Sequence, residues 1–392
     1  MKDLHELFYK FPKEFPLPFV VDGATGTALI KRGMPSGECT ETWVLEHPDT
    51  IREVQDAYRK SGSNAVYAPT FGANAPTLGR HRIKCDVCEL NRRLAELSVS
   101  GGLTGGDMSP TGLFIEPYGD TPFDDIVDIY AEQAKGLCEA GVDFFIIETM
   151  ISLNEIRGAV MGIRSVSDKP IFATLTVDKN GRTMSGDDLA CAVITLAELG
   201  VCAIGTNCSV GPDAMLEVLR PLTPLALAYG IPLIAKPNAG MPHEDENGCT
   251  HFDLSADEFA SFAPSFTDAG ALILGGCCGS DDSFISALSA ALKAHEPNIT
   301  AAPADIEGIA CTNREWINVT DLSDIVEVDD DFLDNIDEDA DYLCLRVSDT
   351  DAAEIFCEEA FSLTQPIAMT GDAEAIEYCK RYFNGHIHVF EE

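Results

Sequence analysis

Short apolar segments that end in small or polar residues recur along residues 18–280 of this chain. They lack alternation of apolar and polar positions, which is typical of strands buried on both faces of a parallel sheet. Helical patterns separate them. In residues 47–62, Ile51, Val54 and Tyr58 share one face and Pro48 suits the first helical position. The apolar segments begin at Pro18, Asn64, Gly102, Phe144, Ile171, Cys202, Pro232 and Ala271.

Eight strands that alternate with helices predict an α/β fold, specifically a (β/α)8 TIM barrel. A doubly wound open sheet is the rival interpretation. Such a sheet rarely has eight strands at such regular spacing, and no G-x-G-x-x-G motif follows the first predicted strand. The pattern therefore favours the barrel.

A stretch rich in Pro, Ala and Asp, residues 295–305, interrupts this pattern. A smaller α/β pattern follows, and about 90 residues are enough for a small domain or a docked appendage. We predict two domains, a barrel over residues 1–295 and a small acidic α/β domain of unknown role over residues 305–392. In the second, the predicted strands are 324–328, 341–347, 365–371 and 386–390, and the predicted helices are 351–363 and 372–383.

Of the 392 residues, 45% are hydrophobic and 23% are charged, a composition typical of a soluble globular protein. No run of 18 apolar residues is present, so we expect no membrane span. The first 15 residues contain acids and no apolar core segment, so we expect no secretory signal. Fourteen scattered cysteines without a disulfide-like spacing fit a reducing, cytoplasmic location.

The formal net charge is −39, which disfavours nucleic acid as a partner because phosphate contacts need Lys and Arg. The charge is uneven. From Ala301 onward there are 24 Asp and Glu against 4 Lys and Arg, a formal charge of −20. Two interpretations stay open: an adaptation that increases solubility, and a surface that docks a basic partner.

Three cysteines follow predicted strands. Cys208 follows the sixth strand, and Cys277 and Cys278 follow the eighth between glycines. The carboxyl ends of barrel strands open onto one mouth, so these three residues are able to converge. Three thiolates form a tetrahedral zinc site with one open position, as catalytic sites have. The alternative is that all three are small core residues.

Six segments together resemble the homocysteine S-methyltransferase family, most closely the homocysteine-binding module of cobalamin-dependent methionine synthase. The resemblance extends over about residues 15–295, roughly seventy per cent of the chain, and the two cysteine motifs are its most specific part. The segments are Asp22–Thr27 (DGATGT), His47–Asp49 (HPD), Thr70–Asn74 (TFGAN), Gly205–Pro212 (GTNCSVGP), Pro237–Gly240 (PNAG) and Gly275–Gly279 (GGCCG).

The resemblance implies methyl transfer to the thiol of homocysteine, forming methionine, at one Zn²⁺ per chain held by Cys208, Cys277 and Cys278. It also implies that Asp22 and Glu148 are catalytic residues that hold the homocysteine ammonium. A buried ammonium does need carboxylate partners, although Asp22 could also be a turn residue. The remaining implied substrate-binding residues are Gly23, Ala24 and Thr25, through backbone amides, and Asn207 and Asn238.

The two asparagines have alternatives. By resemblance both orient the substrate, and Asn238 could instead occupy the open metal position before substrate arrives. Either one could be a simple turn residue. Two departures from the family pattern are also present: Ala235-Lys236 precedes PNAG where relatives often carry an acid, and residues 106–112 read GDMSPTG instead of GDIGPTG. We expect these departures to affect the surroundings of the metal or the approach of the donor, not the metal ligands.

The methyl donor stays open. The resemblance favours a methylcorrinoid, but the chain has no D-x-H-x-x-G signature, so a corrinoid would arrive on a separate partner protein. S-methylmethionine or another donor, and another small thiol or selenol as acceptor, are alternatives. A further alternative is a protein that is not an enzyme, namely a non-catalytic zinc-binding scaffold subunit. Residues 301–392 are a candidate docking or oligomerisation element, and the oligomeric state is open.

Overall fold

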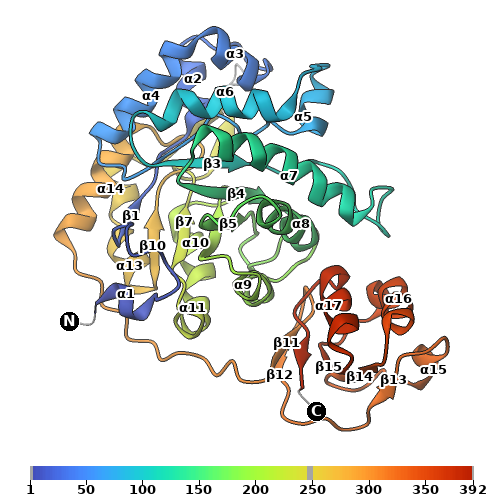
Figure 1. Cartoon of the computed structure of the whole chain (residues 1–392). Coiled ribbons are helices and arrows are strands. Elements are labelled where there is room, and N and C mark those ends of the chain that lie inside the picture. Colours follow the sequence, from blue (N-terminus) through green and yellow to red (C-terminus); the bar gives the residue numbers. More distant parts are fainter. Residues whose placement is uncertain (1–2, 245–249, 391–392) are drawn as a thin grey trace.

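The computed structural model describes residues 3–244 and 250–390. Eight parallel strands form one curled sheet in the order β1-β10-β7-β6-β5-β4-β3-β2 (Figure 1). All eight predicted strands are present, and the predicted TIM-barrel class is confirmed. The strands are β1 Phe19–Val20, β2 Val66–Tyr67, β3 Thr104–Met108, β4 Phe144–Met150, β5 Ile171–Leu175, β6 Ala203–Asn207, β7 Leu233–Lys236 and β10 Ala271–Leu274.

Side chains close the barrel between its first and second strands. The backbone amide of Asn64 donates to the Val20 carbonyl oxygen at 2.7 Å. The backbone amide of Val20 in turn donates to the side-chain oxygen Oδ1 of Asn64 at 2.7 Å. Nearer the mouth, the Tyr67 amide donates to Asp22 Oδ2 at 2.8 Å. Asn64 and Asp22 therefore supply acceptors that satisfy strand backbone groups where β1 and β2 are too short to pair along their length.

The two-residue period of a strand divides the barrel into an inner and an outer core. In β4, Phe144 and Ile146 belong to an inner cluster, whereas Phe145 and Ile147 pack in the outer cluster beneath the helices. Glu148 is the next inward position. The sequence FFIIE therefore carries a carboxylate into the barrel directly above its apolar interior.

The amino-terminal segment fills one end of that interior with aromatic rings. Phe11 and Phe15 are buried in the inner cluster, and their ring centroids lie 5.6 and 6.3 Å from that of Phe172 on β5. Phe19 and Phe144 belong to the same cluster and contact these rings. Because this end is packed solid, the space for a ligand is left at the opposite end, where the strands finish.

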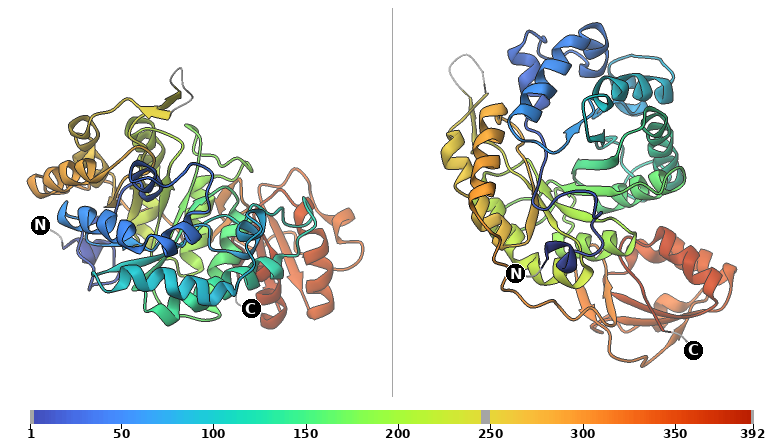
Figure 2. Two further views of the ribbon diagram at one scale, coloured as in Figure 1. Left: turned by 90° about the horizontal axis from the view of Figure 1, so that it is seen from above. Right: turned by 60° about the vertical axis from the view of Figure 1, so that its left-hand side comes forward.

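Helices surround the sheet (Figures 1 and 2). In α4, Pro48 takes the first helical position and Ile51, Val54 and Tyr58 are buried, as predicted. An antiparallel hairpin, β8 Pro242–Glu244 and β9 Thr250–Phe252, follows β7. The helices of this part are α1 Leu4–Leu7, α2 Thr25–Lys31, α3 Thr40–Glu46, α4 Pro48–Lys60, α5 Ala75–Arg80, α6 Val87–Val99, α7 Phe123–Ala140, α8 Leu153–Arg164, α9 Leu189–Glu198, α10 Pro212–Leu219, η1 Arg220–Leu222, α11 Thr223–Tyr229, α12 Ala256–Ala260, α13 Ala263–Asp268 and α14 Asp282–Ala294.

The carboxyl-terminal part has its own parallel sheet, in the order β13-β14-β15-β16, and its own apolar core. The strands and helices that the sequence predicts here are present. The chain between α14 and β11 contains no helix or strand, and the predicted domain division falls within it. The elements are β11 Ile309–Cys311, β12 Trp316–Asn318, β13 Val326–Glu327, α15 Phe332–Asn335, β14 Leu343–Val347, α16 Thr350–Glu359, η2 Ala360–Ser362, β15 Ile367–Gly371, α17 Ala373–Tyr382 and β16 His388–Val389.

The β11–β12 hairpin joins the two parts. Ile309 and Cys311 pack in the outer core of the barrel, whereas Ala310 packs with Cys344 and Ala368 of the small sheet. Alternate side chains of one strand therefore face the two bodies. The views of Figure 2 show the carboxyl-terminal part beside the barrel.

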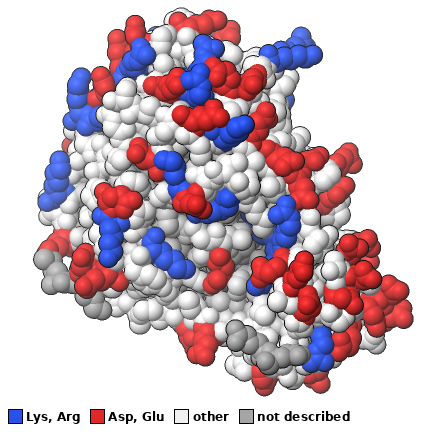
Figure 3. Space-filling model, viewed as in Figure 1, with Lys and Arg blue, Asp and Glu red and all other residues white. Residues whose placement is uncertain are grey.

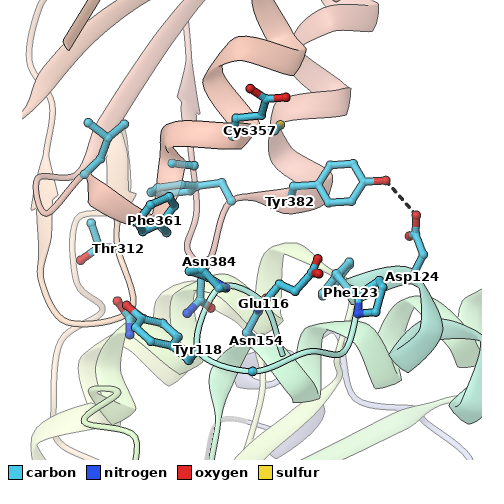
Figure 4. Close-up of a pocket in the computed structure, with 18 residues that line it drawn as sticks. Glu116, Tyr118, Phe123, Asp124, Asn154, Thr312, Cys357, Phe361, Tyr382 and Asn384 are labelled. Atoms are coloured by element: carbon cyan, nitrogen blue, oxygen red, sulfur yellow. Dashed lines mark hydrogen bonds between the residues drawn. The ribbon is translucent and has the colours of Figure 1, made fainter. Parts of the chain in front are cut away.

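Polar contacts reinforce this attachment. The buried Arg157 guanidinium of α8 donates to the carbonyl oxygens of Lys380 and Arg381, each at 2.9 Å. These carbonyls end α17, where intrahelical partners are missing. Nearby, the Tyr382 hydroxyl donates to Asp124 of α7 at 2.9 Å (Figure 4). A cavity of about 620 Å³ opens beside this contact, between Tyr118 of the barrel and Phe361 of the carboxyl-terminal part, which Figure 4 also shows.

Acidic side chains gather on the carboxyl-terminal part (Figure 3). Most are exposed, including Asp329, Asp330 and Asp331 beside α15. Among the described residues, no helix has the length and apolar character needed to cross a membrane.

Candidate metal and substrate site

A cavity of about 310 Å³ lies at the carboxyl ends of the barrel strands. The ends of seven strands contribute to its lining, so the barrel geometry gathers residues that are far apart in sequence. Most of the predicted site residues line it, and Asn207 and Asn238 do not. The predicted residues in the lining are Asp22, Gly23, Ala24, Thr25, Glu148, Cys208, Cys277 and Cys278.

The three cysteines converge as a potential metal-binding group. Their sulfur atoms all lie within 4.8 Å of one another, and Cys208 Sγ lies 4.0 Å from Cys278 Sγ. A tetrahedral zinc ion with Zn–S bonds of about 2.3 Å requires sulfur atoms roughly 3.8 Å apart. The separation in the structure fits that requirement, and all three cysteines are free of disulfides.

The backbone that presents Cys208 is strained. Cys208 and Ser209 directly follow β6 and both adopt left-handed conformations, with φ of 62° and 59°. Such values are uncommon outside glycine and cost about 1–3 kcal/mol each unless surrounding contacts hold them. The Cys208 amide donates to the Lys236 carbonyl oxygen at 3.1 Å, and the Val210 amide to the Cys208 carbonyl oxygen at 2.7 Å. These bonds fix the turn that aims the thiol at the mouth.

Glycine makes room for the second cysteine motif. A Cβ atom on Gly276 would lie 2.1 Å from Ser280 Oγ, which no side chain tolerates without a shift. The space is used by a tight turn in which Ser280 Oγ donates to the Cys277 carbonyl oxygen at 2.6 Å. The Ala239 amide then donates to the Cys278 carbonyl oxygen at 2.9 Å. The flanking glycines thus allow two adjacent thiols to be held near a third.

The three thiols compete for protons. Hydrogen bonds from Cys277 and Cys278 lower the pKa of Cys208. The same contact with Cys208, followed by that with Cys278 and by burial, raises the pKa of Cys277. The pKa of Cys278 is raised to about 11, chiefly by its hydrogen bond with Cys208. A divalent cation resolves such a conflict because it replaces the shared protons.

Asp22 and Glu148 already have a cation between them. Lys236 Nζ, at the end of β7, donates to Glu148 Oε2 at 2.9 Å and lies 3.8 Å from Asp22 Oδ1. It also lies 3.8 Å from the centroid of the Tyr67 ring, within the range of a cation–π interaction. All four side chains are buried. Burial works against the charged Lys236, but Glu148, Tyr67 and Asp22 outweigh it and raise the lysine pKa.

The acidic groups outnumber this cation. Burial raises the pKa of Asp22 to about 6, although Lys236 and the Tyr67 amide act in the opposite direction. Asp107, at the end of β3, also lines the cavity, and burial followed by the Glu148 charge raises its pKa well above the usual range. Its Oδ1 is buried and forms no hydrogen bond with any described residue. Burial therefore favours the neutral form of Asp107 over its charged form.

Asn207 lies behind the cavity wall. Its Oδ1 accepts from the Thr149 amide at 2.9 Å and from Thr174 Oγ1 at 2.8 Å, and its Nδ2 donates to Thr149 Oγ1 at 2.8 Å. Thr149 has a φ of 64° and lies at an irregularity of β4 next to Glu148. Asn207 is fully buried. Its observed contacts therefore fix the strand end that carries Glu148.

Asn238 lies beside the cysteines. Its side chain forms a hydrogen bond with Cys208 that lowers the thiol pKa. Its Oδ1 is buried and has no hydrogen-bond partner among residues 3–244 and 250–390. A buried amide oxygen without a partner costs free energy, so a further group at this position would be stabilising. This unsatisfied oxygen next to three thiols also fits a metal site.

The amides after β1 are only partly available. The Ala24 amide donates to the Ser280 carbonyl oxygen at 3.0 Å, so it is engaged within the protein. Of the three residues predicted to bind the substrate carboxylate, this leaves the amides of Gly23 and Thr25. The Gly23 backbone lies close to its neighbours, because a Cβ there would be 2.9 Å from the Tyr58 ring.

Lys236 and Asp107 line the cavity but are not among the predicted site residues. Strand parity indicates the direction of Lys236: Ile234 faces the inner core, so the two-residue period of β7 turns Lys236 inward as well. Asp107 stands in a similar position at the end of β3.

Together, the eight-stranded barrel and the cysteine cluster at its mouth define a barrel protein with a potential metal site next to paired carboxylates. The sequence matches the model of the homocysteine S-methyltransferase family over residues 19–292. The chain belongs to this family of enzymes.

The chain is also similar in sequence to curated proteins and in fold to a solved structure. The chain is 31% identical to methionine synthase of Mycobacterium tuberculosis over 310 residues, which are 73% of this chain and 26% of that protein. Methionine synthase of Mycobacterium leprae is 31% identical over 297 residues, 70% of this chain and 24% of that protein. The chain thus spans about a quarter of the length of these relatives. The metallated homocysteine methyltransferase MmuM from Escherichia coli has a similar fold, with a TM-score of 0.58, 21% identity, and coverage of 69% of this chain and 95% of that chain.

Proposed function

We propose that this protein transfers a methyl group to the thiol of homocysteine, forming methionine, at a single zinc ion held by Cys208, Cys277 and Cys278. The observation that carries the proposal is the convergence of three thiols at the barrel mouth, in one cavity with two buried carboxylates. Membership of the homocysteine S-methyltransferase family supports the acceptor and the reaction.

A zinc ion held by these cysteines would supply Lewis acidity that lowers the pKa of the homocysteine thiol, so that its proton is released to water and the sulfur stays nucleophilic. The sulfur–methyl bond forms as the bond between methyl and donor breaks, and that electron pair stays with the donor. The residues of the chain hold the acceptor in place for this step. Orientation of this kind lowers the barrier because the reacting atoms start close together and aligned.

The acceptor's charged groups have partners in the cavity. Asp22 and Glu148 receive the ammonium of homocysteine, and the amides of Gly23 and Thr25 receive its carboxylate. Asn207 acts on Glu148 through the strand end that it fixes. Asn238 orients the substrate beside Cys208, and its unsatisfied Oδ1 is an acceptor for this purpose.

The donor that we favour is a methylcorrinoid carried by a separate protein, because the motifs of residues 22–279 most closely resemble the homocysteine-binding module of cobalamin-dependent methionine synthase and no D-x-H-x-x-G signature accompanies them. S-methylmethionine is the second candidate. The acidic carboxyl-terminal part, residues 305–392, is a candidate surface for docking a donor protein, since its charge favours a basic partner.

A methionine-formation assay separates these possibilities. Zinc-loaded protein is supplied with homocysteine and, in parallel, with a methylcorrinoid protein or S-methylmethionine. Turnover with either donor, lost in Cys208→Ala, supports the proposal and identifies the donor. Absence of turnover with both, while zinc remains bound, would favour a non-catalytic scaffold.

A further inference from the structure

The carboxylates proposed for the substrate ammonium are occupied by a side chain of the protein itself. Lys236 Nζ lies 2.9 Å from Glu148 Oε2 and 3.8 Å from Asp22 Oδ1. The lysine side chain is only 3% exposed, so its charge is not shared with solvent. An incoming ammonium therefore meets a carboxylate pair that already has a cation.

Several contacts hold Lys236 in this position. The ring of Tyr67, itself buried, lies beneath the ammonium, with 3.8 Å between Nζ and the ring centroid. The Lys236 carbonyl oxygen accepts the Cys208 amide, so the end of β7 is fixed at the metal site. A buried lysine needs such partners because an unpaired charge in the interior is costly. Lys236 is thus a resident cation of the acceptor cavity.

The presence of Lys236 changes whether an acceptor needs an ammonium group in order to bind. Sites built to pair with a polar group of the substrate reject analogues without it, because buried groups of the protein are left unpaired. Here Lys236 keeps Glu148 paired when no substrate ammonium is present. Asp22 Oδ1 accepts no hydrogen bond from any described residue, so it is still available to an ammonium that does arrive.

We propose that Lys236 is a specificity-determining residue that relaxes the requirement for an α-ammonium group, so that the acceptor cavity also binds short thiols that carry a carboxylate alone. This inference rests on the proposed function, because it concerns the same cavity and the same thiol ligand. It adds a class of acceptor, the ω-mercaptocarboxylates, to homocysteine.

Binding measurements test the proposal without a methyl donor. The zinc-loaded full chain is titrated calorimetrically with homocysteine, with 4-mercaptobutanoate, which lacks only the ammonium, and with 3-aminopropane-1-thiol, which lacks only the carboxylate. In the wild type, the Kd of 4-mercaptobutanoate should lie within about tenfold of that of homocysteine, since no buried charge loses its partner.

The variant Lys236→Met should reverse the preference. Without the lysine, 4-mercaptobutanoate leaves both carboxylates without a cationic partner, and its Kd should exceed that of homocysteine by about 100-fold. 3-Aminopropane-1-thiol should bind about tenfold more tightly to Lys236→Met than to the wild type, because its ammonium replaces the missing cation. Lys236→Arg, which keeps the charge, should retain the wild-type preference. Zinc content, measured in each protein, controls for the contact between Lys236 and Cys208.

A wild-type protein that binds homocysteine but discriminates against 4-mercaptobutanoate by more than about 100-fold would overturn the inference, even if Lys236→Met does not fold. An unchanged preference in a folded Lys236→Met protein would also overturn it. Binding of 4-mercaptobutanoate without binding of homocysteine would contradict the proposed function, and with it the inference that such thiols bind in addition to homocysteine. Binding of homocysteine with strong discrimination against 4-mercaptobutanoate would overturn the inference alone. Binding of neither thiol would overturn both.

Discussion

The barrel mouth and the carboxyl-terminal part both place acids at the ends of parallel strands, but these acids do different things. After β14 and β15, Asp349 and Asp372 cap the helices that follow, by accepting from the amides of Ala352 and Ala375, each at 3.0 Å. At the barrel mouth, Asp22 and Glu148 cap no helix and face a cavity that contains a lysine and three thiols. Strand-end acids become a candidate site where they are buried and present a carboxylate oxygen to a cavity, as Asp22 does with Oδ1 while its Oδ2 serves barrel closure.

The region with the higher density of acidic residues is not the one with the candidate site. Residues 301–392 carry a formal charge of −20 and residues 1–300 a charge of −19, so the small region is far more acidic per residue. Its acids are nevertheless mostly exposed (Figure 3), where screening by water and salt weakens their effect. Two buried acids at the barrel mouth, Asp22 and Asp107, have raised pKa values of the kind that accompany functional sites.

The largest contrast should come from Glu148→Gln compared with Asp349→Asn. Glu148→Gln keeps an oxygen acceptor but removes the negative charge that pairs with Lys236 and with the substrate ammonium. Truncating one member of a buried charged pair costs about 2–5 kcal/mol, so kcat/KM for homocysteine should fall about 10²-fold or more. Asp349→Asn should leave kcat/KM unchanged in the same assay. Equal effects of the two substitutions would remove the functional distinction between the regions.

The pH dependence sharpens the role of Asp22. Its pKa, raised by burial to about 6, means that the carboxylate is lost as the pH falls through that value. Ammonium binding needs the anion, so kcat/KM should decline about tenfold per pH unit below about 6. Protonation of this group itself favours the folded state between pH 6 and 3.8, because its folded pKa lies above the unfolded one. The decline is therefore not unfolding driven by Asp22.

A pH–rate profile of Asp22→Asn is the control for that prediction. The amide oxygen of Asn still accepts the Tyr67 amide, so barrel closure is preserved while the titrating group is removed. The limb near pH 6 should disappear in the variant. A limb that persists unchanged would assign it to another group, and zinc analysis at each pH would show whether metal loss contributes.

A smaller effect should follow from Arg157→Met, which tests how firmly the two regions are joined. The substitution keeps the apolar stem but removes both donors to the carbonyl oxygens at the end of α17. We expect a loss of about 2 kcal/mol in unfolding free energy, measured by denaturant titration. Homocysteine binding should be unaffected, because residues of the barrel alone line the acceptor cavity. A marked change in binding would show that the regions are coupled.

The smallest effect should come from Asp372→Ala. Loss of this cap removes the acceptor for the Glu374 and Ala375 amides and should cost about 1 kcal/mol, seen as a shift of thermal unfolding. Asp372→Asn retains an acceptor and should be nearly neutral. A fall in methionine formation with folded Asp372→Ala would indicate that the carboxyl-terminal strand ends have a functional task after all.

Much of the fold follows from local pattern. Buried apolar runs locate all eight barrel strands because a parallel sheet covered on both sides leaves no polar face. The meeting of Cys208 with Cys277 and Cys278 is predictable because carboxyl ends of barrel strands share one mouth. Barrel closure by Asn64 and Asp22 is not predictable in this way, since it depends on how short β1 and β2 are.

The finer arrangement of the site depends on side-chain direction. Asn207 and Glu148 both stand at strand ends, yet Glu148 reaches the cavity and Asn207 is held within the wall by Thr149 and Thr174. Sequence alone does not reveal the irregularity of β4 at Thr149, the residue to which the Asn207 side chain is bonded. The direction of the Lys236 side chain, by contrast, is predictable. It follows from the two-residue period of β7 once Ile234 is known to face the inner core.

Metal content tests the central claim most directly. Zinc is measured by mass spectrometry in the purified wild type, in Cys208→Ala, and in Cys202→Ala, a matched control whose buried thiol donates to the Ile171 carbonyl oxygen at the far end of β6. The account predicts one zinc per chain in the wild type and in Cys202→Ala, and loss of zinc in Cys208→Ala. A wild type without zinc after careful metal loading, or equal zinc in all three proteins, would contradict it.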